Sequence, residues 1–164
     1  MLKYLWITLI VIVLDQITKQ LAEHFLAFHV PVPVMPLFNL TLSYNTGAAF
    51  SFLSEAGGWQ RWFFVILALI VSVVIVMWLR KLPIQDKWVA IALAMVLGGA
   101  LGNVVDRILL GHVIDFLHVY YEQWSFPIFN IADSAISVGV AILLIDSFFG
   151  GHKKHKKDQE ASHD

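Results

Sequence analysis

Four long apolar stretches run along the chain, separated by more polar segments, over residues 4–24, 62–79, 88–106 and 128–149. A membrane-spanning helix needs about 20 mostly apolar residues, because each adds about 1.5 Å toward crossing a hydrocarbon core of about 30 Å. The pattern therefore predicts a mainly α-helical membrane protein with four transmembrane helices. Tryptophans near the predicted helix ends fit an interfacial aromatic belt: Trp59, Trp62, Trp78, Trp88 and Trp124.

The first apolar stretch also has the length of a cleavable signal peptide. Asp15 and Lys19 interrupt it, however, and no convincing small-x-small cleavage site follows. We therefore interpret this stretch as a retained membrane helix.

Two outer segments, residues 25–61 and 107–127, connect helices one to two and three to four. In FNLTLSYN, residues 38–45, polar and apolar residues alternate, as is typical of a strand with one apolar face. The following Thr-Gly predicts a turn, after which AAFSFL, residues 48–53, is expected to return as a second strand. HVIDFLHVYY, residues 112–121, is rich in β-branched and aromatic residues and predicts another strand. Together they predict a small antiparallel β-platform on the outer membrane surface.

Composition supports membrane residence and excludes several classes of function. The chain of 164 residues is 59% hydrophobic, only 14% charged, and has a mean hydropathy of +0.74. A soluble domain of this length lacks the polar residues to cover such an apolar interior. The net charge of −1 gives no indication of a nucleic-acid partner. The absence of cysteine from the sequence excludes disulfides, thiol catalysis and thiolate metal sites.

The distribution of basic residues predicts the orientation in the membrane. Eight of the 11 lysines and arginines fall on one side of the four predicted helices, which the positive-inside rule assigns to the cytoplasm. Both termini are therefore expected in the cytoplasm. Residues 1–150 are expected to form one membrane domain, and residues 151–164 a basic, disordered tail. The eight residues are Lys3, Arg80, Lys81, Lys87, Lys153, Lys154, Lys156 and Lys157.

Polar residues inside the predicted helices converge at one depth. Ionisable residues in a membrane helix usually face the bundle interior and have a partner. Asp15 and Lys19 are four residues apart, so they share a helix face and can pair. Asn103 lies near the outer end of the third helix, and Asn130 and Asp133 share a face near the outer end of the fourth. Three helices thus place polar groups in the outer half of the membrane.

Several of these residues also have an ordinary structural explanation. Asp15 and Lys19 can form a structural ion pair within the membrane. Asn103 is typical of a residue that makes a hydrogen bond between helices. Asp106 and Arg107 are adjacent, and we interpret them as an interfacial charge pair.

Asp115 lies in the outer connection between the third and fourth helices. If this connection folds back over the bundle, Asp115 can approach Asp133; the sequence permits this approach without requiring it. Two carboxylates in a low-dielectric site cannot both ionise cheaply and therefore share one proton. The charged member of such a pair can activate water while the protonated member polarises a carbonyl group. That is the chemistry of an aspartyl protease.

A transporter or proton-conducting protein also places acids within membrane helices. A conduction path needs polar groups through the full depth, whereas the second and fourth predicted helices are apolar toward the cytoplasm. A metal site is a further alternative, because His112, Asp115 and His118 are spaced three apart.

A serine protease is another alternative, with Ser134 or Ser137 as the nucleophile and Lys19 as the base. A non-enzymatic membrane scaffold is a further alternative for a chain with four apolar helices. A scaffold, however, has no need for clustered acids.

Five blocks of residues give the chain a resemblance to the bacterial lipoprotein signal peptidases, or signal peptidases II. Each block is weak alone, but their order on a four-helix chain of this length is specific. The resemblance runs from about residue 4 to residue 149. The blocks are DQITK (15–19), NTGAAF (45–50), GGALGNVVDR (98–107), VIDF (113–116) and FNIAD (129–133).

The resemblance implies an intramembrane aspartyl endopeptidase of the bacterial inner membrane, with its active site near the periplasmic face. Such enzymes cleave diacylglyceryl-modified prolipoproteins before the lipidated cysteine. We expect a monomer among membrane lipids, with no metal or cofactor. The resemblance assigns catalysis to Asp115 and Asp133, without indicating which one holds the proton. The positions it implies in substrate binding or site support are Asp15, Lys19, Asn45, Asn103, Arg107 and Asn130.

Overall fold

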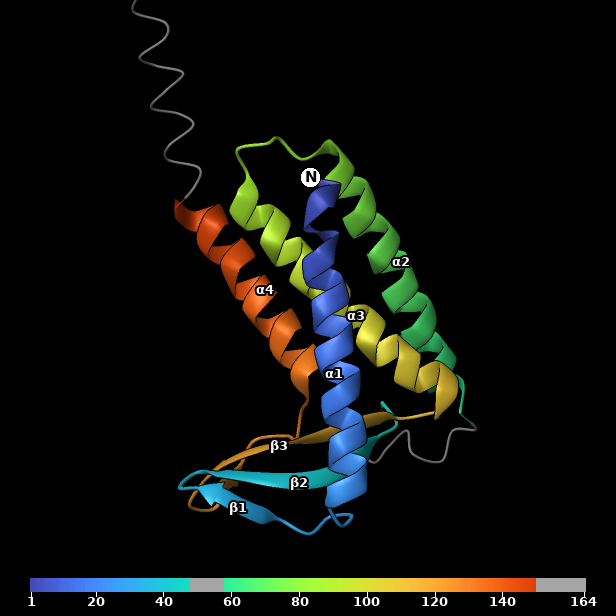
Figure 1. Ribbon diagram of the computed structural model, residues 1–164, viewed down its shortest axis with the longest axis vertical. Helices are drawn as coiled ribbons and strands as arrows, with labels where there is room; N and C mark the ends of the chain where they lie inside the picture. Colours follow the sequence, from blue (N-terminus) through green and yellow to red (C-terminus); the bar gives the residue numbers. More distant parts are fainter. Residues whose placement is uncertain (48–57, 150–164) are drawn as a thin grey trace, which may run out of the picture.

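The computed structural model describes residues 1–47 and 58–149. Over these residues it contains a short 3-10 turn, η1 (Leu2–Tyr4), four long helices and a small sheet at one end of the helix bundle (Figure 1). All four helices are long and apolar enough to cross a membrane, which confirms the predicted spans. The helices are α1 (Leu5–Phe25), α2 (Trp59–Lys81), α3 (Lys87–Leu109) and α4 (Ile131–Phe149).

The fourth helix begins three residues later than the hydropathy pattern predicted. Residues 128–130 lie outside the helix, because the carbonyl oxygen of Phe129 accepts hydrogen bonds from the backbone N–H groups of Phe116 and Leu117. The predicted placement of Asn130 within the fourth helix is therefore wrong. Asn130 instead lies directly before the first helical residue, Ile131.

The third helix is the centre of the bundle, and each of the other three helices packs against it. Glycines allow this close approach, as expected in membrane helices. A Cβ atom at Gly98 would lie 2.7 Å from Cβ of Val11 in α1, and one at Gly99 would overlap the carbonyl oxygen of Ala132 in α4. These contacts bring the polar residues of α1, α3 and α4 together.

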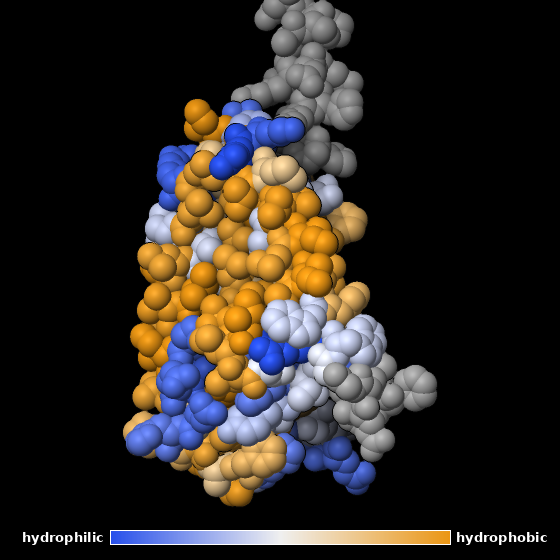
Figure 2. All heavy atoms as spheres, turned by 90° about the vertical axis from the view of Figure 1, so that its right-hand side faces the viewer, coloured by the Kyte–Doolittle hydropathy of each residue, from blue (hydrophilic) through white to orange (hydrophobic). Residues whose placement is uncertain are grey.

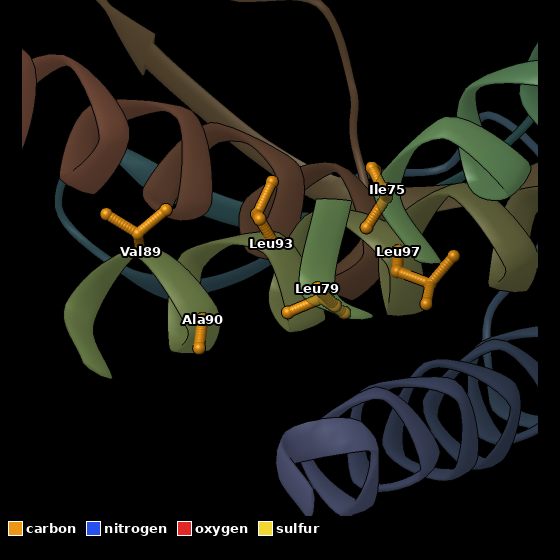
Figure 3. Close-up of a cluster of buried hydrophobic side chains, with 6 residues drawn as sticks. All are labelled: Ile75, Leu79, Val89, Ala90, Leu93 and Leu97. Carbon is orange, nitrogen blue, oxygen red and sulfur yellow. The ribbon is translucent and has the colours of Figure 1, made fainter. Parts of the chain in front are cut away.

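The half of the bundle far from the sheet is held by apolar packing between α2 and α3. Leu79 and Ala90 are fully buried there, and Leu93 is 2% exposed (Figure 3). This arrangement leaves the outer surfaces of the helices apolar. Figure 2 shows them as a hydrophobic band between two more polar ends.

Within the part of the chain that the structure describes, the sheet has four antiparallel strands in the order β1-β2-β3-β4. β2 (Phe38–Asn45) and β3 (Val113–Tyr121) confirm the two strands predicted from FNLTLSYN and HVIDFLHVYY. β1 (Val32–Met35) and β4 (Trp124–Ser125) were not predicted. The return strand expected at residues 48–53 lies outside the described residues. The sheet partners of β2 are β1 and β3.

A register shift between Leu40 and Ser43 modifies the expected alternation along β2. Thr41 and Leu42 are both buried, although a regular strand would place them on opposite faces. Beyond the shift, Ser43 pairs with Asp115 and Asn45 pairs with Val113. This register places Asn45 beside Asp115.

The amino terminus, the α2–α3 connection and the end of α4 lie together at the end of the bundle opposite the sheet (Figure 1). Lys3, Arg80, Lys81 and Lys87 therefore gather at one end, in agreement with the charge pattern used to predict orientation. The basic tail of residues 151–164 lies outside the described residues.

Candidate active site

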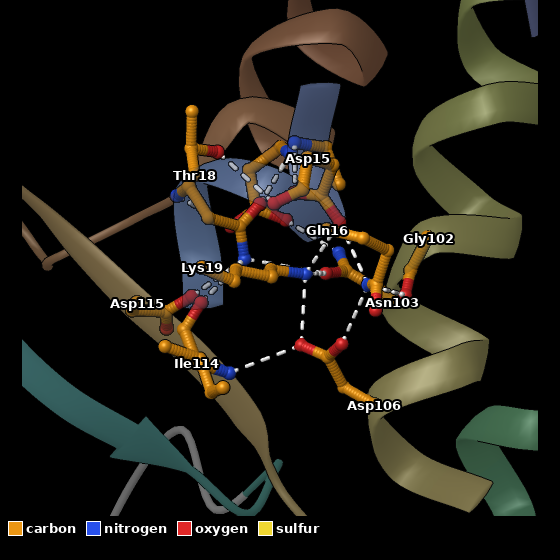
Figure 4. A network of polar contacts seen from close by, with 12 residues as sticks. Asp15, Gln16, Thr18, Lys19, Gly102, Asn103, Asp106, Ile114 and Asp115 are labelled. Carbon is orange, nitrogen blue, oxygen red and sulfur yellow. Dashed lines mark hydrogen bonds and ion pairs between the residues drawn. The ribbon is translucent and has the colours of Figure 1, made fainter. Parts of the chain in front are cut away.

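A buried lysine forms the centre of a polar network between α1 and α3 (Figure 4). The Nζ atom of Lys19 lies 2.7 Å from Oδ2 of Asp15 and 2.8 Å from Oδ2 of Asp106. It also donates a hydrogen bond of 3.0 Å to Oδ1 of Asn103. The predicted pairing of Asp15 with Lys19 is therefore confirmed, and the pair is buried, with side chains at most 1% exposed.

Asp106 has a different place from the one predicted. It was expected to form an interfacial charge pair with Arg107, but it lies inside the bundle at 2% exposure and pairs with Lys19. Adjacent residues on a helix point about 100° apart, so Asp106 and Arg107 cannot share a direction. Gln16 supports Asp106 by donating a 2.8 Å hydrogen bond to its Oδ1 atom. The sequence analysis missed the pairing of Asp106 with Lys19 and the support that Gln16 gives to Asp106. A signal for the first was present, because Asp106 lies three residues from Asn103 and so shares its helix face.

The two acids bound to Lys19 each hold a backbone N–H group beside another aspartate. Oδ2 of Asp106 accepts a 3.1 Å hydrogen bond from the N–H of Ile114, which directly precedes Asp115. Oδ1 of Asp15 accepts a 2.9 Å hydrogen bond from the N–H of Ala132, which directly precedes Asp133. The ion-pair network therefore fixes the positions of both segments that carry the candidate catalytic acids.

Asn130 and Asp133 form a reciprocal cap at the start of α4. The Oδ1 atom of Asn130 accepts a 2.9 Å hydrogen bond from the N–H of Asp133, and Oδ2 of Asp133 accepts a 3.3 Å hydrogen bond from the N–H of Asn130. Such a capping box satisfies backbone donors that the first helical turn leaves free. It also holds the Asp133 carboxylate at the end of the helix nearest the sheet, where the helix dipole favours negative charge.

Two asparagines link Asp115 to Asp133. The Nδ2 atom of Asn130 donates to Oδ1 of Asp115 at 2.7 Å and to Oδ1 of Asn103 at 3.2 Å. The Nδ2 atom of Asn103 in turn donates to Oδ1 of Asp133 at 2.8 Å. The strand β3 thus does fold back over the bundle. The structure brings Asp115 into the same hydrogen-bonded cluster as Asp133.

Asp115 has an electrostatic environment that favours its neutral form. It is 2% exposed. Burial, followed by the negative charge of Asp133, raises its pKa to about 7, although hydrogen bonds from Asn45 and Asn130 oppose this rise. Near neutral pH, this carboxyl group can therefore hold a proton or release it, which is the property that general acid–base chemistry requires.

Asn45 from β2 and Arg107 from α3 also interact with the cluster. Nδ2 of Asn45 donates a 3.1 Å hydrogen bond to Oδ2 of Asp115, and its side chain is exposed. The guanidinium of Arg107 lies 5.1 Å from the ring centre of Phe64, and its charge interacts with Asp133 and Asp115. Its buried Nε atom has no hydrogen-bond partner among the described residues. Arg107 is thus a cation that interacts with both acids, and its Nε–H group is a hydrogen-bond donor that no described residue uses.

The contacts do not favour a serine protease. The hydroxyl of Ser134 donates to the carbonyl oxygen of Asn130 at 2.8 Å, within its own helix. Ser137 is exposed on the bundle surface. Lys19 is an ion-paired cation with two carboxylates, so it is poorly suited to accept a proton from either hydroxyl.

The proposed metal ligands do not converge. Among residues 1–47 and 58–149, no group of three or more histidine, cysteine, aspartate or glutamate side chains could hold a metal ion. Asp115 and His118 are three apart on a strand, and this spacing places them on opposite faces. The ring of His118 instead contacts Thr41 and Ser125.

The polar network is concentrated at the sheet end of the bundle. In the opposite half, the hydroxyls of Thr8 and Ser72 donate to the backbone carbonyls of Ala94 and Ala68. Those polar groups are thereby occupied within the helices. This distribution favours a localised site over a transport path through the membrane.

Comparison with known proteins gives a family for this arrangement. A family model described as signal peptidase (SPase) II matches residues 7–149. A lipoprotein signal peptidase of Pseudomonas paraeruginosa is 51% identical over 164 residues, covering 99% of this chain and 94% of the relative. The lipoprotein signal peptidase of Teredinibacter turnerae is 57% identical over 150 residues, covering 91% of this chain and 89% of the relative.

A solved structure described as a bacterial membrane enzyme has a similar fold. It superimposes with a TM-score of 0.80 at 32% sequence identity, covering 90% of this chain and 93% of the other. A second structure with the same description superimposes with a TM-score of 0.78, also at 32% identity. The four-helix bundle with its terminal sheet is thus similar to a known membrane-enzyme architecture.

Proposed function

The chain belongs to the signal peptidase II family, and from this premise we propose that it removes the signal peptide from diacylglyceryl-modified prolipoproteins. Asp115 and Asp133 act as the catalytic pair, and cleavage occurs before the lipidated cysteine. The observation that carries this proposal is the asparagine-bridged cluster that holds both carboxylates at the sheet end of the bundle.

The two acids divide the work of peptide hydrolysis between them. Asp115, whose pKa is about 7, holds the proton and donates a hydrogen bond to the scissile carbonyl oxygen. Asp133 takes a proton from the attacking water. The hydroxide adds to the carbonyl carbon, and a tetrahedral intermediate forms. Asp133 then gives this proton to the amide nitrogen. The C–N bond breaks, and the carboxylate and amine products leave.

The surrounding residues keep the pair in this geometry. Asn130 and Asn103 orient the two carboxylates through their side-chain amides. Asn45 and Arg107 interact with the acids from β2 and α3, and they bind the substrate backbone. The Lys19 network is a positioning device, since it holds the residues that precede each aspartate.

The proposed substrate enters sideways from the outer leaflet of the bacterial inner membrane. The site lies where the helices meet the sheet, so a lipid-modified cysteine can reach it while its acyl chains stay in the bilayer (Figure 1). The positive-inside rule places this end in the periplasm and both termini in the cytoplasm. We propose that the enzyme acts as a monomer.

Cleavage of a purified substrate tests the proposed function. We expect the detergent-solubilised protein to cut a diacylglyceryl-modified prolipoprotein, with the new amino terminus at the modified cysteine. The same prolipoprotein without the lipid is the matched control, and its cleavage should be much slower because it lacks the acyl chains that bind to the apolar surface of the enzyme beside the site. Mass spectrometry of the products identifies the bond. Equal cleavage of both substrates, or a cut elsewhere, would contradict the proposal.

The pH dependence of cleavage tests the role of Asp115. Since its pKa is about 7, kcat/KM should fall as the pH rises above that value and the pair loses its shared proton. Asn45→Ala removes a hydrogen bond that stabilises the ionised carboxylate, so the pKa of Asp115 rises and the alkaline limb moves to higher pH.

The control is Tyr44→Phe, because the Tyr44 hydroxyl contacts Glu23 and leaves Asp115 untouched. Its alkaline limb should match that of the parent enzyme. A limb that stays in place in Asn45→Ala, or shifts to lower pH, would rule out Asp115 as the proton carrier.

A further inference from the structure

An apolar groove of about 820 Å³ opens on the surface of the bundle, in the half opposite the sheet. It exists because α1 and α2 both pack on α3 but have little direct contact with each other. Its walls include Leu9 and Ile12 from α1 and Val73 and Met77 from α2, and Leu97 lies in its floor. None of these residues belongs to the candidate active site.

The lining of the groove leaves an almost purely apolar surface. The two hydroxyl groups that border it, those of Thr8 and Ser72, are occupied by backbone carbonyl oxygens at 2.8 and 2.7 Å. An occupant of the groove therefore gains nothing from polar groups along its length. This chemistry suits a hydrocarbon chain.

One charged residue, Arg80, lies at the rim of the groove. It belongs to the last turn of α2, at the end of the bundle where Lys3, Lys81 and Lys87 also gather. Within residues 1–47 and 58–149, its guanidinium makes no ion pair. Figure 2 shows hydrophilic groups at this end, directly above the hydrophobic band. A cation above an apolar groove matches a phosphate group above acyl chains.

The charge at the rim argues against the substrate's signal helix as the occupant of the groove. A signal peptide begins with a positively charged region, which under the proposed orientation would lie beside Arg80 and be repelled. A phospholipid instead brings its phosphate group to this cation.

We propose that the groove between α1 and α2 is a binding site for an anionic phospholipid, with its acyl chains against the apolar walls and its phosphate at Arg80. Under the orientation proposed above, this lipid comes from the cytoplasmic leaflet. The site is separate from the cleavage site. It binds a structural lipid that fills the gap between two helices that do not pack on each other.

Lipid titration of the purified full-length protein in detergent micelles tests this site. Phosphatidylglycerol and phosphatidylcholine with identical acyl chains are added in turn, and retained lipid is measured by native mass spectrometry. Phosphatidylglycerol should bind about fivefold more tightly, the effect expected of one basic residue on an anionic headgroup. Arg80→Gln should remove this preference. Lys81→Gln, which deletes the same charge one residue away and outside the groove lining, should retain it.

A second variant tests the apolar part of the site. Val73→Phe fills the groove from a position that is 58% exposed, so it should fold normally and weaken the binding of both lipids. If Arg80→Gln and Lys81→Gln had equal effects, the preference for phosphatidylglycerol would come from general surface charge, and the proposal would be overturned. Unchanged lipid binding in Val73→Phe, or displacement of the lipid by a synthetic signal-sequence helix, would also overturn it. Cleavage of lipidated substrate by Arg80→Gln is measured in parallel. Because the groove is separate from the cleavage site, a failure of the lipid proposal can be told apart from a failure of the proposed peptidase function.

Discussion

Replacing either Asp115 or Asp133 by asparagine is expected to eliminate cleavage of a diacylglyceryl-modified prolipoprotein while the bundle stays folded. Asparagine has nearly the same shape and keeps one of the two acceptor oxygens that each carboxylate offers to its neighbours, but it cannot take or give a proton. Loss of a general acid or base typically reduces the rate by about 10²–10⁴-fold, and both roles depend on the pair. Each single variant should therefore fall below detection in a standard assay.

The measurement compares the initial rates of the purified variants with their unfolding temperatures in detergent. Asp146→Asn is the matched control, because Asp146 lies in the same helix as Asp133 but toward the end opposite the sheet. This control should cleave at the parent rate. Substantial turnover by Asp115→Asn or Asp133→Asn, in protein that melts normally, would disprove the two-aspartate mechanism.

The largest effect on stability is expected from Lys19→Met. Lys19 is fully buried between Asp15 and Asp106, so its loss leaves two buried carboxylates without a counter-charge. Breaking a buried ion pair from one side typically costs about 3–5 kcal/mol. The variant should show a markedly lower free energy of unfolding. It should also lose activity, because the backbone of Ile114 and Ala132 is held through the same acids.

A compensated variant separates charge from volume. Replacing Lys19 by methionine together with Asp15→Asn and Asp106→Asn removes all three charges and should recover much of the lost stability, since a neutral buried cluster avoids the cost of desolvation. Lys3→Met, at an exposed position before α1, is the control for loss of a lysine. Stability of Lys19→Met equal to that of Lys3→Met would show that the network is not needed for folding.

The differences between prediction and structure have local physical causes. The fourth helix was predicted from hydropathy alone, and hydropathy does not distinguish an extended apolar residue from a helical one. Phe129 is apolar, but it pairs with β3 across the sheet, so the helix begins after the cap at Asn130. The edge strand β1 was missed because Pro33 weakens any strand prediction. A proline is tolerated at the edge of a sheet, and only the assembled sheet shows that this strand lies there.

Asp106 is a second example of tertiary context. Its sequence neighbour Arg107 suggested a surface pair, whereas helix geometry turns the two side chains apart. The partner of Asp106 is Lys19, 87 positions away along the chain, and the two meet because α1 packs on α3 through glycines. Periodicity within one helix identifies the face on which a residue lies. It does not identify the helix that this face will meet.

The sequence by itself determined that this chain has four membrane helices, a β-platform built on two of its strands and a set of polar residues at one depth. Hydropathy and alternation are local properties of the chain, so they predict the helices and strands. The cost of burying polar groups in a membrane then makes polar residues within the helices face the interior of the bundle. Only the tertiary structure decided which acids share a site. The side chains of Asp115 and Asp133 are brought into one cluster by the register of β3 against β2, the cap of α4 and the Lys19 ion pairs, and each of these joins segments that the sequence alone leaves apart.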